Sequence, residues 1–204
     1  MSELRPEHFA RDDDAPDEAF YAQPRLVTHI DDAAVAAVTA LYRAHFPAGG
    51  AVLDLMSSWV SHLPPEASYA RVAGLGMNAA ELRANPRLTE RVTQNLNADP
   101  RLPFEDAAFD AAGCCVSVQY LTRPVAVFAE AARVLRPGAP FVVTFSNRCF
   151  PTKAVAAWRA LDDRGHAALV TRYFADAGGW GEVRAEQFGA RRGDPLYAVI
   201  GFRM

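Results

Sequence analysis

The amino-acid sequence predicts an α/β protein whose mostly parallel sheet is covered by helices on both faces. Short apolar segments bounded by glycine or proline recur along the chain and are typical of buried strands. Segments with apolar residues three and four positions apart lie between several of them and predict helices. Strands that alternate with helices need crossover connections, which give parallel pairing.

Length and composition favour one globular domain. The chain has 204 residues, of which 50% are hydrophobic and 22% are charged. This is enough for one sizeable core and is far from the composition of a disordered chain.

The first third of the chain contains an irregular arm, a helix and a strand. Residues 1–24 are acidic and contain several prolines, which predicts an arm without regular structure. Asp31 and Asp32 precede a predicted helix over residues 33–46, and the short apolar segment 51–55 predicts a buried strand. We therefore divide the chain into an N-terminal arm, residues 1–30, and a domain, residues 31–204.

The remaining elements alternate in the same way. Further strands are expected over residues 69–75, 91–96, 109–118, 140–145, 182–187 and 196–203. Further helices are expected from Asn78 onward and over residues 125–135, 152–161 and 165–177. The last two strands are close enough to form a hairpin. Because ligands bind at the carboxyl ends of parallel strands, the loops after the first five strands are the expected site.

Charge and cysteine content argue against several classes of partner. The formal net charge is -3 and the arginines are scattered, so we expect no nucleic-acid partner. There is no apolar run of about 18–20 residues, so we expect no membrane span and a cytoplasmic location. Three cysteines without CxxC spacing predict neither a disulfide framework nor a metal site, although Cys149 lies near the expected rim of the site. The sequence does not indicate an oligomeric state.

Three stretches carry a family resemblance. They are Val52-Leu53-Asp54-Leu55, the LPFEDAAFD stretch of residues 102–110 and the ARVLRPG stretch of residues 132–138. Together they resemble class I S-adenosylmethionine-dependent methyltransferases, over roughly residues 33–203. The resemblance implies a Rossmann-like doubly wound sheet of about seven strands, in the order 3-2-1-4-5-7-6 with the last strand antiparallel. It also implies S-adenosyl-L-methionine as the cofactor.

The loop after the first strand departs from the family pattern. Typical members continue with Asp-x-Gly-x-Gly-x-Gly, whereas here Asp54 is followed by Leu55-Met56-Ser57-Ser58 and then Trp59. The chain resembles a variant branch with an SSWVSHLP loop. We expect Asp54 to brace the loop, Met56 to lie beside the cofactor, and the hydroxyls of Ser57 and Ser58 to bind its methionine carboxylate. Trp59 either supports the loop or lies over the sulfonium as a cation–π partner.

Two other cofactor positions also differ. The family has an acidic residue for the ribose at the end of the second strand, where this chain has Gly76 followed by Met77 and Asn78. Asn78 either contacts the ribose or caps the next helix. After the third strand, the acid that meets the adenine is replaced by Asn95-Leu96-Asn97. Amide oxygens can accept the same bond, at about 0.5–1.5 kcal/mol against about 1.5–3 for a charged acceptor.

The acceptor side of the site has a candidate base and a candidate cover. His62 is either a general base at the rim or a loop histidine bonded to backbone. Tyr21, Arg25 and His29 either cover the site or pack on the surface, and Arg25 would suit a carboxylate. The predicted substrate pocket consists of Tyr21, Arg25, His29, Trp59, Ser117, Gln119, Tyr120, Asn147 and Arg148.

These residues predict a methyltransferase that acts on a small-molecule acceptor. The Asn-Pro-Pro-Tyr/Phe signature of amide and adenine methylation is missing, and so short a chain has little inserted structure for reading a macromolecule. One alternative is a non-catalytic protein that binds a ligand or partner through the altered pocket. Another is a different nucleotide-using α/β enzyme.

Overall fold

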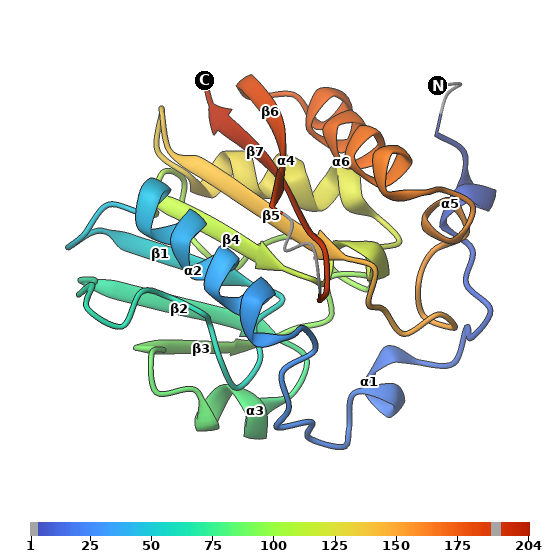
Figure 1. Cartoon of the computed structure of the whole chain (residues 1–204), viewed down its shortest axis with the longest axis horizontal. Coiled ribbons are helices and arrows are strands. Elements are labelled where there is room, and N and C mark those ends of the chain that lie inside the picture. Colours follow the sequence, from blue (N-terminus) through green and yellow to red (C-terminus); the bar gives the residue numbers. More distant parts are fainter. Residues whose placement is uncertain (1–3, 189–192) are drawn as a thin grey trace.

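The computed structural model describes residues 4–188 and 193–204. Its strands form one sheet in the order β3-β2-β1-β4-β5-β7-β6 (Figure 1). The pairs among β1 to β5 are parallel, whereas β7 runs antiparallel to both β5 and β6. This confirms the predicted strand order and the antiparallel last strand. The strands are β1 (Ala51–Leu55), β2 (Arg71–Gly76), β3 (Glu90–Thr93), β4 (Ala111–Cys115), β5 (Pro140–Ser146), β6 (Trp180–Phe188) and β7 (Leu196–Arg203).

Helices cover both faces of the sheet, as predicted. In Figure 1, α2 lies in front of the sheet and α4 and α6 lie behind it. Asp31 begins α2 as an N-cap, because its Oδ1 accepts the Ala34 N–H at 2.9 Å. The α-helices are α1 (Asp17–Phe20), α2 (Asp32–His45), α3 (Ala79–Ala84), α4 (Pro124–Val134), α5 (Ala156–Arg159) and α6 (Asp163–Ala177). The 3-10 helices are η1 (Pro6–Phe9) and η2 (Val118–Tyr120).

Alternate residues of the strands face two separate hydrophobic cores. Val52 and Val142 lie in a core with Leu41 of α2. Their neighbours Leu53 and Val143 lie in the core on the opposite face, which includes side chains of α4 and α6. Burial on both faces explains why these strands read as continuous apolar segments.

Several boundaries differ from the prediction, mostly at the carboxyl ends of strands. β3 ends at Thr93, because the Asn95 side chain accepts the Asn97 N–H at 2.9 Å and turns the chain. β4 ends at Cys115, just before Val116, whose φ of 44° is incompatible with a strand. The helix expected over 152–161 is only the short α5. The closing hairpin is confirmed, although residues 189–192 of its connection lie outside the described residues.

The N-terminal segment, here residues 4–31, is mostly irregular and contains only η1 and α1 before α2. It runs along the side of the molecule at which the arrows of β1, β2 and β4 end (Figure 1). Within the described ranges, no helix is both long and apolar enough to cross a bilayer.

Candidate functional site

A cavity of about 310 Å³ lies at the carboxyl ends of β1 to β4, underneath the N-terminal segment. Most predicted cofactor and acceptor residues line it, which the parallel topology accounts for. The predicted residues along its wall are Met56, Ser57, Ser58, Met77, Asn78, Asn95, Leu96, Asn97, Tyr21, Arg25, His29, Ser117, Tyr120 and Arg148. Those that do not line it are Asp54, Trp59, His62, Gln119 and Asn147.

The loop after β1 keeps a glycine-like turn without a glycine. Met56 stands at the first glycine position of the family motif, and its φ is 58°. Residues other than glycine rarely adopt this left-handed conformation. The Ser57 N–H then donates to the Leu75 carbonyl at 2.7 Å, which fixes the loop against β2.

Asp54 lies beneath this loop. Its Oδ2 accepts bonds from the Ser57 and Ser61 hydroxyls, each at 2.6 Å. Burial raises the pKa of Asp54 to about 6, and the two hydroxyl bonds only partly oppose this. The contacts agree with the bracing role that the sequence suggested.

The serine hydroxyls do not have the geometry that the sequence led us to expect. Ser57 gives its proton to Asp54, and Ser58 gives its proton to the Glu81 carboxylate at 2.7 Å. Since a hydroxyl has one proton, neither can also donate to a cofactor carboxylate in this conformation. The predicted role of these two hydroxyls is therefore revised: they hold the loop in place.

The structure gives a steric reason for the missing ribose acid. A Cβ built on Gly76 would lie 2.1 Å from the Ser57 carbonyl oxygen, so no side chain fits there. The loop after β1 occupies the space that an acidic side chain would need. The changes in these two loops are therefore linked.

Asn78 is the N-cap of α3. Its Oδ1 accepts the N–H groups of Ala80 and Glu81, at 2.9 and 3.1 Å. Its Nδ2 donates to the carbonyls of Tyr21 and Ala22, at 2.8 and 3.1 Å. The capping interpretation is confirmed, and the amide also ties down the N-terminal segment, so its two donor hydrogens are no longer free for a ribose.

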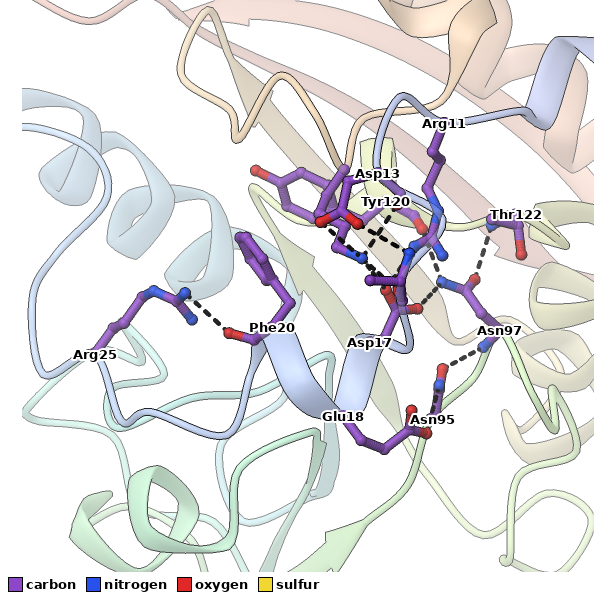
Figure 2. Close-up of polar contacts among 12 residues, drawn as sticks. Arg11, Asp13, Asp17, Glu18, Phe20, Arg25, Asn95, Asn97, Tyr120 and Thr122 are labelled. Atoms are coloured by element: carbon purple, nitrogen blue, oxygen red, sulfur yellow. Dashed lines mark hydrogen bonds and ion pairs between the residues drawn. The ribbon is translucent and has the colours of Figure 1, made fainter.

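Carboxylates from the N-terminal segment reach the end of β3, where the sequence has only amides. Asn95 Nδ2 donates to Glu18 Oε1 at 2.8 Å, and Asn97 Nδ2 donates to Asp17 Oδ2 at 2.9 Å (Figure 2). Asn97 Oδ1 accepts the Thr122 N–H at 2.8 Å. The predicted adenine-binding amides therefore join the segment to the sheet.

A buried charge network holds this segment in place. Lys153 is fully buried, and its Nζ lies 3.2 Å from Asp13 Oδ2 and 3.4 Å from Asp17 Oδ1. The same Nζ donates to the Ala15 carbonyl at 2.7 Å. Arg11 Nη1 donates to Asp17 Oδ1 at 2.6 Å, so Asp17 is shared by two cations (Figure 2).

Aromatic side chains surround the covering residues. The Arg25 guanidinium carbon lies 4.5 Å from the centre of the Phe20 ring and 5.3 Å from that of Phe150. The His29 ring meets Phe150 edge-on, with centroids 5.4 Å apart. Burial lowers the pKa of His29, which favours the neutral imidazole near neutral pH.

His62 and Trp59 have structural contacts outside the cavity. The His62 carbonyl accepts the Thr39 hydroxyl at 3.0 Å, and its backbone φ is 52°. This places His62 as a loop histidine away from the cavity wall. Trp59 Nε1 donates to the Val27 carbonyl at 3.0 Å, which supports the packing interpretation and not a place over the sulfonium.

Gln119 and Asn147 also lie off the cavity wall. Gln119 is buried, and its Nε2 donates to the Val116 carbonyl at 2.9 Å. Asn147 is exposed, and its Oδ1 accepts the Ser146 hydroxyl at 3.2 Å. Both side chains stabilise their own loops.

Sequence reasoning missed Glu81, Arg11, Asp17 and Phe150, which all line the cavity. Glu81 stands three residues after the N-cap Asn78, which is the spacing of a capping box. In the structure its carboxylate instead accepts the Arg25 N–H at 2.7 Å. Arg11 and Asp17 come from the N-terminal segment, far from the strand ends in sequence, whereas Phe150 lies in the loop after β5.

Comparisons with known proteins agree with this architecture. Residues 55–143 match the sequence family described as Methyltransferase domain. No curated protein matches the chain.

Solved structures share the fold at low sequence identity. A putative methyltransferase of Haloferax volcanii, in complex with the Trm112 activator, superposes with a TM-score of 0.61 at 17% identity, covering 83% of this chain and 88% of that one. The 4+2 cyclase SpnF gives 0.64 at 13% identity, covering 91% of both chains. A possible histamine N-methyltransferase of Thermotoga maritima gives 0.60 at 13% identity, covering 84% and 90%.

The sheet order and the match over residues 55–143 point to the same fold family. In fold and in residues 55–143, the chain resembles the class I S-adenosylmethionine-dependent methyltransferases.

Proposed function

We propose that the chain is an S-adenosylmethionine-dependent methyltransferase that acts on a small-molecule acceptor. The observation that carries this proposal is the cavity at the ends of β1 to β4, whose walls include Met56, Met77 and Leu96. These are the strand ends at which the family binds its cofactor. Structures of a Haemonchus contortus phosphoethanolamine N-methyltransferase, 51% of which superposes on this chain, contain S-adenosylmethionine or S-adenosylhomocysteine.

The chain's own residues would hold the cofactor through shape more than through charge. The loop after β1 is fixed by Asp54 and by the Leu75 carbonyl, so it presents a preformed wall. After β3, the buried apolar residue Leu96 also lines the cavity, and Asn95 and Asn97 flank it. The cofactor supplies an electrophilic methyl group, and the protein accelerates transfer mainly by holding the acceptor in line with it.

His29 is the proposed proton acceptor, in place of His62. It is the histidine that lines the cavity, and its lowered pKa keeps the imidazole able to take a proton from a hydroxyl or amine near neutral pH. The adjoining Phe150 ring limits its orientation.

The volume of the cavity supports a small acceptor. About 310 Å³ lies at the lower end of the range of roughly 300–1,000 Å³ for ligand pockets. The N-terminal segment covers the strand ends, which leaves little room for a macromolecule. The cytoplasmic location stays an expectation from the sequence.

A non-catalytic binding protein is the second candidate, because the Ser57 carbonyl excludes an acid at position 76. The likeness to a cyclase also shows that this fold does not fix one reaction.

Calorimetric titration is the first step of the test. We expect saturable binding of S-adenosylmethionine and S-adenosylhomocysteine, and no binding at millimolar concentration would refute the proposal. In the second step, methyl-labelled cofactor and a small-molecule cell extract should give labelled product. His29→Gln should slow this labelling by about 100-fold, in line with general-base contributions. Binding without any labelling would favour the non-catalytic candidate.

A further inference from the structure

Three arginines line the cavity, and Arg25 differs from the other two in its partners. Arg11 Nη1 lies 2.6 Å from Asp17 Oδ1, and Arg148 Nε lies 2.8 Å from Asp194 Oδ1. In residues 4–188 and 193–204, no carboxylate oxygen lies within 4.0 Å of the Arg25 guanidinium nitrogens. Its charge therefore has no direct counterion within the described parts of the chain.

The guanidinium of Arg25 is nevertheless held in one place. Its central carbon lies 4.5 Å from the centre of the Phe20 ring and 5.3 Å from that of the Phe150 ring. Its Nη2 donates to the Phe20 carbonyl at 3.0 Å, as Figure 2 shows. The other terminal nitrogen, Nη1, is buried and has no hydrogen-bond acceptor among the described residues.

A buried charged donor without an acceptor is unfavourable, so this geometry favours an anionic ligand that completes it. The planar fork of a guanidinium suits a carboxylate or a phosphate. Glu81 also lines the cavity, and its carboxylate accepts the main-chain N–H of Arg25. This nearby negative charge favours a carboxylate, with one charge, over a phosphate dianion.

We propose that Arg25 binds a carboxylate group inside the cavity and that this group belongs to the methyl acceptor. The second half rests on the proposed function. It is supported by Phe150, which contacts both Arg25 and the proposed base His29 and so brings them to one part of the cavity. The methionine carboxylate of the cofactor is the other possible source of the same chemistry.

The test compares wild-type protein with Arg25→Gln and Arg25→Lys. Arg83→Gln is the matched control, because Arg83 is exposed on α3 and does not line the cavity. In one arm, S-adenosylhomocysteine and 5′-methylthioadenosine are titrated; the second compound has the nucleoside but lacks the carboxylate. In the other arm, benzoate and its neutral analogue benzamide are titrated by NMR into protein with and without saturating S-adenosylhomocysteine.

We expect wild-type protein and Arg83→Gln to bind benzoate at least tenfold more tightly than benzamide. Arg25→Gln should lose this preference and Arg25→Lys should keep part of it, with affinity for both nucleosides unchanged. If Arg25→Gln instead weakens only S-adenosylhomocysteine, the carboxylate site stands and its source is the cofactor, which overturns the assignment to the acceptor. Equal affinities of wild-type and Arg25→Gln protein in both arms would overturn the site itself. Failure of wild-type protein to bind S-adenosylhomocysteine would refute the proposed function, while benzoate binding to the unloaded protein would still test Arg25.

Discussion

At the scale of single residues, Met56 shows how the loop after β1 differs from a glycine-rich loop. Its left-handed φ of 58° is unfavourable for any residue with a Cβ. We predict that Met56→Gly is more stable than Met56→Ala by about 1 kcal/mol, because both lose the side chain but only glycine relieves the backbone. Urea denaturation of the two variants measures the difference.

A matched pair at Ala37, in the middle of α2, gives the control. There Ala37→Gly should be destabilising by about 1 kcal/mol, because a helical backbone favours alanine. If the glycine variant at position 56 is also less stable than the alanine variant, the turn does not have the conformation described above.

Asp54 gives the protein a characteristic pH dependence. Burial raises its pKa from 3.8 to about 6, so the folded protein holds a proton that the unfolded chain releases between these values. The contribution of the protonated Asp54 carboxyl to the stability of the folded protein is therefore fully present below about pH 4. It is lost as the pH rises through about 6. We predict that the unfolding free energy falls relative to Asp54→Asn by up to about 1.4 kcal/mol per pH unit in this interval.

Denaturant unfolding of wild-type protein and Asp54→Asn, from pH 4 to 7, tests this linkage. The difference between their unfolding free energies should change across the interval and level off above it. Parallel profiles would contradict a raised pKa for Asp54.

At the scale of elements, the N-terminal segment owes its position to buried charges. Lys153 is fully buried and bonds Asp13, Ala15 and Asp17 of the segment. We predict that Lys153→Met frees the segment, because Asp13 loses its cation and Asp17 keeps only Arg11. Breaking a buried ion pair such as Lys153–Asp17 costs about 3–5 kcal/mol. Hydrogen exchange over residues 10–22 should accelerate strongly.

Arg159→Met is the matched control for Lys153→Met. Arg159 pairs with Asp12 of the same segment, but the pair is exposed, and such pairs contribute about 0–1 kcal/mol. In Arg159→Met, hydrogen exchange over residues 10–22 should stay close to that of wild-type protein. Equal acceleration in both variants would mean that the buried network does not hold the segment.

The elements also show which features local sequence can predict. β1, β7 and α2 were placed almost to the residue, because apolar runs and an aspartate cap define them locally. β3 and β4 were predicted too long, because an asparagine turn and a strained Val116 end them. Apolar character alone does not reveal either feature.

At the scale of the whole molecule, the sheet topology made much of the cavity predictable. Residues after β1 to β4 meet at one edge, so Met56, Asn78 and Asn97 could be placed together from the strand order. Arg11 and Asp17 could not be placed, because their position depends on contacts with Asn97 and on Lys153, over 130 residues away in sequence. Such long-range polar contacts have no periodic signature.

The central claim is that S-adenosylmethionine binds in the cavity beneath the N-terminal segment, and one crystal structure tests it most directly. Crystals grown with saturating S-adenosylhomocysteine should show its methionine part beside Met56, its adenine beside Leu96 and its ribose near Gly76. An empty cavity at these positions, or the ligand bound elsewhere on the protein, would contradict the account.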